Sequence, residues 1–219
     1  MAGFVPAPTI LEIGTGHGRW SRYLRPLCER LLLVDISQQC IAACESLFDG
    51  DPGVQCFVND GESFPTIADA SVDFVFSFDS LVHAEGDVMQ RYICELGRIL
   101  TRDGVAFLHH SNLAAIGRAP FAAGKLPVIG RIVGETSNHW RARSVDAARV
   151  RGWIDDARLH CASQELVNWG TRRLIDCITV IARPGSHHAR ATQIAPNAGF
   201  MAEARSARIV SELYPSGGK

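Results

Sequence analysis

The sequence lacks several features that would direct the protein to a membrane or to a nucleic acid. No uninterrupted apolar run among its 219 residues reaches the roughly 18 to 20 residues needed to span a bilayer. The N-terminus has no basic region followed by an apolar core, so no secretory signal is expected. The formal net charge is only -1, and no basic stripe is visible, which disfavours nucleic acid as a partner. We therefore expect a cytoplasmic protein without a membrane span.

The cysteines are also too few and too scattered to build a scaffold. There are 7 of them, and none forms a Cys-x-x-Cys pair, which excludes a complete disulfide framework and a zinc ribbon. The rest of the composition is ordinary for a globular protein, with 47% hydrophobic and 21% charged residues. A chain of this length is long enough for one α/β domain with a full core, and too short for two comfortable domains.

Short apolar runs alternate with helical patterns along most of the chain. Helices are expected after residue 18, after Ser37 as N-cap, over residues 87–100 and after Ser144 as N-cap. Strands are expected at residues 9–13, 31–36, 54–58, 72–78, 105–108, 161–169 and 174–182. The alternation predicts a doubly wound, mostly parallel α/β sheet in a single domain, with its ligand site at the carboxyl ends of the strands.

Two segments interrupt this alternation. Residues 111–143 contain four glycines and two prolines but no long helix, and we interpret them as a lid or insert over the site. Residues 184–219 follow the last predicted strand and contain one short helical pattern at 200–213. The sequence therefore predicts a domain over residues 1–183 and a C-terminal appendage that is partly disordered.

A glycine loop follows the first predicted strand and precedes the first helix. Its glycines, Gly14, Gly16 and Gly18, allow positive φ angles and let a ligand approach the backbone. The dinucleotide fingerprint Gly-x-Gly-x-x-Gly is excluded because Arg19 stands where its third glycine would be. Glu12, just before the first glycine, can meet a cationic group such as the ammonium of an amino acid.

Other polar residues end the next three strands. Asp35 can accept hydrogen bonds from both hydroxyls of a ribose. Asp60 and Gly61 end the third strand, where a side chain can reach an adenine edge, and Phe78 and Asp79 end the fourth.

Taken together, these motifs resemble the class I S-adenosylmethionine-dependent methyltransferases over about residues 9–183. The resemblance implies a seven-stranded Rossmann-like sheet with one antiparallel strand. It also implies methionine-end contacts from residues 12–18, ribose contacts from Asp35, and adenine contacts near Asp60 and Gly61.

Methyl transfer to an alcohol requires a group that removes the hydroxyl proton. Histidines follow the fourth and fifth strands, where Asp79 and His83 face the expected sulfonium region and His109 and His110 leave the neighbouring strand. We predict that His110, His83 and Asp79 are catalytic and that His109 contacts the substrate.

A divalent metal is a second possibility at the ends of the same two strands. Asp79 matches the first metal position of several class I O-methyltransferases, while His110 and Asn112 stand in the region of the second. Magnesium prefers oxygen ligands, so the histidine is a departure from that pattern. The predicted metal ligands are Asp79, His110 and Glu165, and the metal would lower the pKa of the substrate hydroxyl.

Within the predicted lid, His139, Trp140 and Arg141 combine a titratable ring, an aromatic plate and a cation. We predict that they bind substrate. Residues 76–83, 109–112 and 139–141 together are similar to bacterial sugar and polysaccharide O-methyltransferases, including mycobacterial enzymes that act on methylmannose oligosaccharides. This resemblance implies a sugar or oligosaccharide acceptor.

Two other functions stay open: a methyltransferase for a lipid, quinone or phenol, and a non-catalytic S-adenosylmethionine-binding regulator. Many relatives in the resembled family carry helices before the first strand that close over the cofactor, whereas here the first strand starts near residue 9. Either those helices are missing, or the site is covered by residues 111–143, by the C-terminal tail or by a second subunit, and a homodimer is expected.

Overall fold

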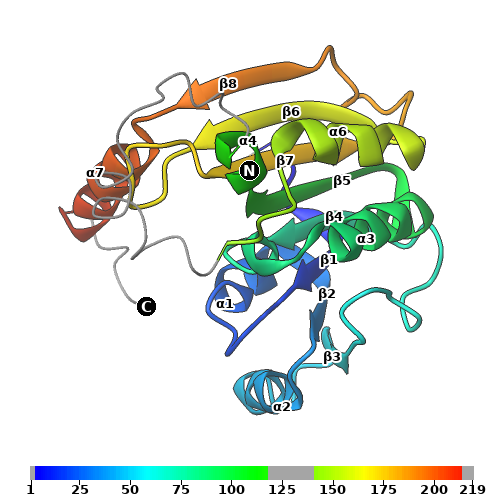
Figure 1. Cartoon of the computed structure of the whole chain (residues 1–219). Helices are drawn as coiled ribbons and strands as arrows, with labels where there is room; N and C mark the ends of the chain where they lie inside the picture. The colour runs from blue at the N-terminus through cyan, green and yellow to red at the C-terminus, as the bar shows by residue number, and fades with distance from the viewer. Residues whose placement is uncertain (1–2, 118–140, 214–219) are drawn as a thin grey trace, which may run out of the picture.

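The computed structural model describes residues 3–117 and 141–213 and shows one α/β unit around an eight-stranded sheet (Figure 1). The strand order is β3-β2-β1-β4-β5-β7-β6-β8. β7 runs antiparallel to β5 and β6, and all other neighbours are parallel. The strands are β1 (Ala7–Ile13), β2 (Cys28–Asp35), β3 (Val54–Val58), β4 (Val72–Ser77), β5 (Leu100–Ser111), β6 (His160–Val167), β7 (Asp176–Ala182) and β8 (Gln193–Asn197). The predicted fold class is confirmed, with one strand more than the seven expected.

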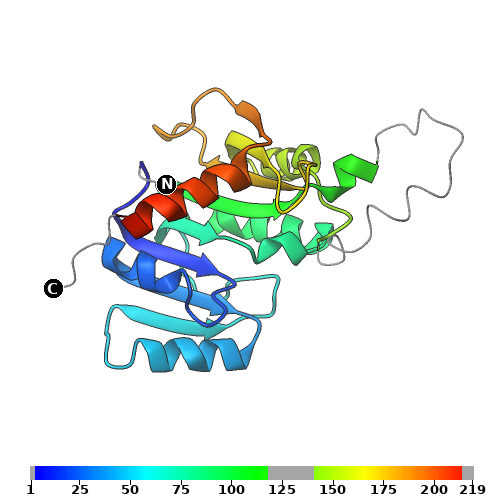
Figure 2. The same ribbon diagram turned by 90° about the vertical axis from the view of Figure 1, so that its left-hand side faces the viewer.

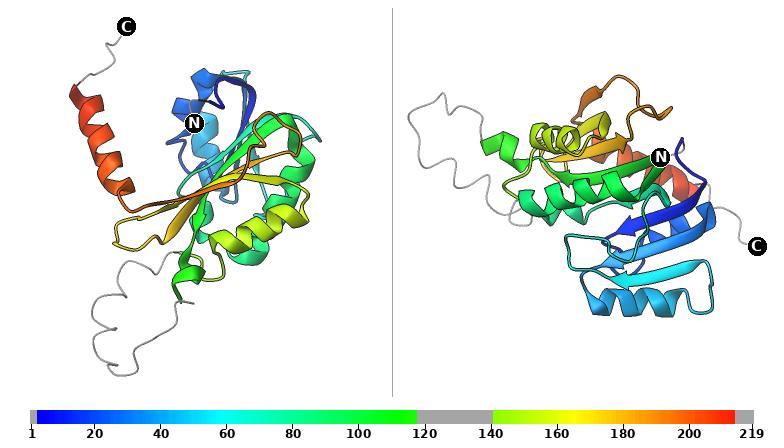
Figure 3. Two further views of the ribbon diagram at one scale, coloured as in Figure 1. Left: turned by 90° about the horizontal axis from the view of Figure 1, so that it is seen from above. Right: turned by 90° about the vertical axis from the view of Figure 1, so that its right-hand side faces the viewer.

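Helices cover both faces of the sheet. α3 (Gly86–Ile99) and α6 (Ala147–Asp156) lie on one face, with α7 (Phe200–Leu213) on the other side of the sheet (Figure 3). α1 (Ser21–Leu24) and α2 (Gln38–Leu47) pack on the face opposite α3, because their buried residues belong to a separate core cluster. Figure 2 shows the sheet running from β3, beside α2, to β8 at the opposite edge. Short helical segments complete the fold: η1 (Arg25–Leu27), η2 (Leu81–His83) and α4 (Leu113–Gly117).

The core explains why these elements form where they do. The apolar stripe of α3 is fully buried at Met89, Ile93 and Leu96, and each such side chain contributes about 1.5–3 kcal/mol through its burial. Along β1, six of the seven residues are buried, as expected for a central parallel strand covered on both faces. None of the helices in the described ranges is long and apolar enough to cross a membrane.

The structure corrects two local predictions. Ser144 does not cap α6; the Asp146 side chain does, accepting from the N–H of Arg149 at 2.8 Å. The fifth strand is much longer than residues 105–108 and extends through His109 and His110, because polar residues at its end hide the apolar run.

Two further predictions concern the domain boundary at residue 183 and the predicted lid. β8 lies beyond the predicted boundary at residue 183 and pairs in parallel with β6; the domain boundary itself stays a prediction. Most of the predicted lid, including His139 and Trp140, falls on residues 118–140, outside the described residues.

Candidate active site

The glycine loop lies between β1 and α1 and adopts the conformation that its glycines permit. Gly14, Gly16 and Gly18 have φ angles of 73°, 52° and 77°. A Cβ atom at Gly14 would lie 1.8 Å from the Oγ of Ser80, whereas no atom lies within 4 Å of a Cβ at Gly16. The loop is therefore packed tightly against the β4 side at Gly14 and is open at Gly16, where a ligand can approach the backbone.

Two carboxylates flank this loop. Glu12 is only 2% exposed and accepts a 2.5 Å hydrogen bond from Ser21 Oγ. Burial raises the pKa of Glu12 to about 8, with the hydrogen bond from Ser21 opposing the shift. Asp35 accepts from the N–H of Gly16 and from the N–H of Ser37, both at 2.9 Å, so it ties the end of β2 to the loop.

A cavity of about 610 Å³ opens beside the loop at the carboxyl ends of β1, β2 and β3. It brings together five residues that the sequence analysis singled out: Gly14, Asp35, Asp60, Gly61 and His83. Its apolar wall comes from residues that were interpreted only as core or connecting residues, chiefly Ile36, Leu81, Ala84, Val88 and Tyr92.

The wall of this cavity fits a nucleoside. Ile36 is 69% exposed although it is a large apolar residue, and it directly follows the ribose candidate Asp35. An exposed isoleucine lining a cavity beside a carboxylate offers apolar contact to a flat base next to acceptors for ribose hydroxyls. The Asn59 side chain donates to the Tyr92 hydroxyl at 3.0 Å, which fixes the far wall.

Asp60 also shapes the cavity through its own turn. Its carboxylate accepts from the N–H groups of Glu62 and Ser63 at 2.8 Å and from Ser63 Oγ at 2.7 Å. These bonds hold the pKa of Asp60 below its usual value, the bond from the Ser63 hydroxyl contributing most. The carboxylate thus stabilises the loop that carries Gly61 at a φ of 83°.

Asp79 is the polar group at the end of β4. It has a φ of 60°, in the left-handed region that residues other than glycine rarely adopt. Its N–H donates to Nδ1 of His109 at 3.2 Å, and its Oδ1 lies 3.7 Å from Nη2 of Arg141. The side chain is still 34% exposed, so the carboxylate can also meet a ligand.

Asp176, which the sequence analysis did not identify, lies behind this turn. Its two oxygens accept from Nε and Nη2 of Arg141, each at 3.0 Å, and Oδ2 lies 3.2 Å from Nε2 of His109. The side chain of Asp176 is fully buried, and that of Arg141 is 8% exposed. Because its fork is already paired with a carboxylate, Arg141 is poorly suited to anchor a substrate acid.

His110 points to the opposite face of the sheet from His109, since neighbouring residues of a strand alternate. The ring is fully buried, with Nδ1 2.8 Å from the carbonyl oxygen of Ser111 and Nε2 2.7 Å from Oγ1 of Thr179. Burial lowers the pKa of His110 to about 4. With both nitrogens engaged below α6, where Gln164 joins the same network, His110 has no free site for a substrate proton.

The predicted metal ligands are not brought together. His110 lies on the other face from His109 and the Asp79 turn, while Glu165 accepts from Nδ2 of Asn197 in β8 at 2.7 Å. Within residues 3–117 and 141–213, no three His, Cys, Asp or Glu side chains are arranged to hold a metal ion. The described residues thus do not bring Asp79, His110 and Glu165 together as a magnesium site, because alternation along β5 turns His110 to the face opposite His109.

Aromatic rings line the mouth around Asp79. The Phe78 ring lies 4.6 Å from His109, 5.3 Å from Trp20 and 5.7 Å from Trp169. Trp169 in turn lies 6.1 Å from Phe200 at the start of α7. Phe78 was predicted to contact the cofactor; Trp20, Trp169 and Phe200 had been interpreted as helix and strand residues. All four rings are partly exposed.

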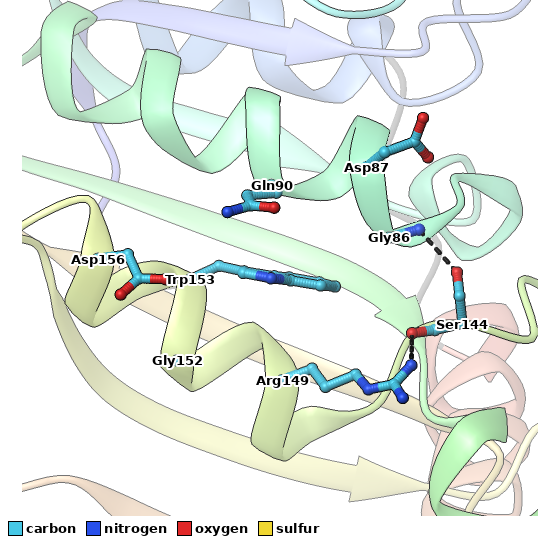
Figure 4. A pocket seen from close by; sticks show the side chains of 8 residues that line it. All are labelled: Gly86, Asp87, Gln90, Ser144, Arg149, Gly152, Trp153 and Asp156. Carbon is cyan, nitrogen blue, oxygen red and sulfur yellow. Dashed lines mark hydrogen bonds between the residues drawn. The ribbon is translucent and has the colours of Figure 1, made fainter.

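The chain that follows residue 140 is fixed to the same end of the sheet. The N–H of Ala142 donates to the Val82 carbonyl at 2.9 Å, and Ser111 Oγ donates to the Ala142 carbonyl at 2.7 Å. Figure 4 shows Ser144 joined to Gly86 of α3 and to Arg149 of α6, at one end of a shallow cavity of about 620 Å³ between these helices. This second cavity contains none of the predicted site residues.

Comparisons with known proteins agree with this geometry. The profile of a methyltransferase domain family matches residues 11–108, which contain the glycine loop, Asp35, Asp60 and Asp79. No curated protein sequence matches the chain.

Solved structures share the fold at low sequence identity. A S-adenosylmethionine-dependent methyltransferase from Methanosarcina mazei aligns with a TM-score of 0.61 and 17% identity, over 83% of this chain and 95% of that one. A TehB-like S-adenosylmethionine-dependent methyltransferase from Corynebacterium glutamicum gives 0.56 and 16%, over 80% of each chain. The N-methyltransferase NodS from Bradyrhizobium japonicum gives 0.56 and 16%, over 82% and 86%. These structures show that the chain shares their fold, and the family profile matches the first part of it, residues 11–108.

Proposed function

We propose that this protein transfers the methyl group of S-adenosylmethionine to a hydroxyl of a small polar acceptor, a sugar or oligosaccharide, with Asp79 as the base. The observation that carries the proposal is the placement of Asp79. Its partly exposed carboxylate stands at the end of β4, next in the chain to Ser80 of the cavity lining and to Phe78 of the aromatic group. The side chain of Asp79 is 34% exposed, and the bond from its N–H to His109 fixes the turn that carries it.

The residues around the cavity fit the cofactor. Gly16 leaves the loop open, Asp35 provides acceptors for ribose hydroxyls, and Ile36 provides an apolar surface for adenine. Glu12 lies behind the loop as a buried acid whose ionised form would favour the ammonium of the methionine part.

Methyl transfer then requires the protein to align the acceptor hydroxyl with the methyl group and to accept one proton. The bound cofactor supplies the methyl group and a neutral sulfur leaving group. The acceptor oxygen forms the new bond to the methyl carbon as the carbon–sulfur bond breaks, and the hydroxyl proton goes to the Asp79 carboxylate. His83 lines the cofactor cavity on η2 and stays a second candidate for proton transfer.

The aromatic rings fit two classes of acceptor. Trp169 and Phe78 offer flat faces that stack on the apolar side of a sugar ring, while Asp79 accepts from its hydroxyls. The same rings favour a second candidate, a phenol, quinone or lipid, because the four aromatics together form a continuous apolar surface. His109 is fully buried, so we propose that it supports the site from behind rather than contacting the acceptor.

The test is methyl transfer from labelled cofactor to matched acceptors: mono- and oligosaccharides, phenols and a quinol, each with magnesium and with chelator. Label in a sugar with chelator present supports the proposal with a metal-independent base. Label only in phenols or quinols supports the second candidate. Tight cofactor binding without transfer to any acceptor would contradict both and favour a non-catalytic, regulatory protein. Sedimentation of the same sample tests the expected homodimer.

A further inference from the structure

The strongest feature outside the proposed machinery is the buried carboxylate of Asp176 on the antiparallel strand β7. It is fully buried, yet it contacts two groups that both lead to Asp79. One path runs through Arg141, which is bonded to both oxygens of Asp176 and faces Asp79 Oδ1. The other runs through His109, which contacts Asp176 with one ring nitrogen and the backbone of Asp79 with the other.

The His109 path fixes a single tautomer. Nδ1 accepts the N–H of Asp79, so it carries no proton, and a neutral ring must then carry its proton on Nε2. Nε2 faces Asp176 Oδ2 at 3.2 Å, and a carboxylate can only accept there. Asp176 therefore selects the tautomer that leaves Nδ1 free to hold the Asp79 backbone.

The held backbone is an unfavourable one. Asp79 has a φ of 60°, in a region where a residue other than glycine persists only when its surroundings hold it there. The bond from its N–H to His109 and the nearby guanidinium of Arg141 are the described contacts that oppose relaxation of the turn.

We propose that Asp176 is a positioning residue for methyl transfer, which acts through His109 and Arg141 to hold Asp79 toward the acceptor. This inference rests on the proposed role of Asp79. The residues of β7 do not line the cavity beside the glycine loop. Through Asp176, this strand would nevertheless help to position the reacting groups.

The first test is Asp176→Asn. An asparagine can turn its amide toward Nε2 of His109 and permit the other tautomer, and it cannot match both N–H groups of the Arg141 fork. A misplaced base lowers turnover by about 100-fold, so we expect that loss in kcat while the cofactor Kd, measured by calorimetry, stays within about threefold of wild type.

A double-mutant cycle separates positioning from general damage to the fold. If Asp176 acts through Asp79, its replacement has little effect in an Asp79→Asn background, whereas a general structural defect lowers activity by the same factor in both backgrounds. Wild-type kcat in Asp176→Asn, or equal losses in the two backgrounds, overturns the proposal. Should Asp176→Asn fail to fold, Arg141→Lys, which keeps the charge and loses the fork, is expected to reduce kcat in the same coupled way.

The matched control is Asp51→Asn. Asp51 pairs with Nε and Nη2 of Arg25 at 2.7 and 2.9 Å, the same fork geometry, just before β3 and away from the mouth. Loss of this carboxylate should leave kcat unchanged.

If the wild type methylates none of the acceptors, the proposed function fails, and hydrogen exchange still decides the inference. The Asp79 amide should then exchange about tenfold faster or more in Asp176→Asn than in wild type; an unchanged rate overturns the proposal.

Discussion

Replacement of Gly14 by alanine tests how the glycine loop is built. The φ of 73° would be imposed on a residue with a Cβ atom, at a cost of about 1–2 kcal/mol. That Cβ would also lie 1.8 Å from Oγ and 2.5 Å from Cβ of Ser80, an overlap that costs about 1–3 kcal/mol to relieve. The two effects together predict a loss of roughly 2–5 kcal/mol in the free energy of unfolding.

Gly16→Ala is the matched comparison. Its φ of 52° imposes a similar backbone cost, but no atom lies within 4 Å of the added Cβ. We therefore expect a loss of only about 1–2 kcal/mol in stability. Cofactor affinity should nevertheless fall, because the methyl group enters the space through which the ligand reaches the loop.

The overlap at Gly14 has a specific remedy, which makes the reasoning refutable. Ser80→Gly removes both clashing atoms and leaves only the backbone strain, so the double variant should regain about 1–3 kcal/mol. Urea unfolding measures these differences, and thermal unfolding should show a shift of roughly 2–4 °C per kcal/mol. If Ser80→Gly does not stabilise Gly14→Ala, or if Gly16→Ala is the more destabilised of the two, the packing argument is refuted.

Three further predictions concern charged groups. Glu12 has a folded pKa of about 8 against an ordinary 4.5. The folded state therefore keeps its proton to a higher pH than the unfolded chain, and stability falls as pH rises between these two values. Glu12→Gln should remove this loss, about 3 kcal/mol at pH 7, as measured by urea unfolding across pH. His110 has a folded pKa of about 4 against an ordinary 6.5, so its stabilising contribution is present above pH 6.5 and lost as pH falls toward 4. The free energy of unfolding of His110→Gln should therefore fall by about 3 kcal/mol less than that of wild type over this acid range. A change in stability at alkaline pH instead would contradict this assignment. Asp35→Ala should weaken cofactor binding about 10- to 100-fold in calorimetry, and unchanged affinity would reject its assignment to the ribose.

The fold could be predicted because the strands of this sheet are short apolar runs with turn residues at their ends. The third strand, residues 54–58, and the helix at 200–213 occur as the sequence predicts. β8 was missed because it has only two apolar side chains and a proline, and it forms only by pairing with the edge of β6. Such pairing depends on which strand lies beside it, which local periodicity does not record.

The residues of the cavity beside the glycine loop were more predictable than the residues around Asp79. Gly14, Asp35, Asp60 and Gly61 lie in one cavity because each follows a strand, and parallel strands end at one edge. Asp176 stands at the start of the antiparallel strand, so it reaches the same edge from the other direction. A prediction that looks for polar residues only at the carboxyl ends of strands cannot identify a residue, such as Asp176, at the start of an antiparallel strand.

The two adjacent histidines show what the alternation of side chains along a strand decides. From the sequence His109 and His110 were both candidate bases, with His110 preferred, and their alternation in β5 separates them. His110 turns toward Thr179 and becomes a neutral, buried part of the core. His109 turns toward the mouth, but both of its nitrogens are occupied, by Asp176 and by the Asp79 backbone. A base must have an atom that a substrate can reach. This requirement disfavours His109 and His110 and is the reason for the proposed role of Asp79, whose backbone N–H donates to His109.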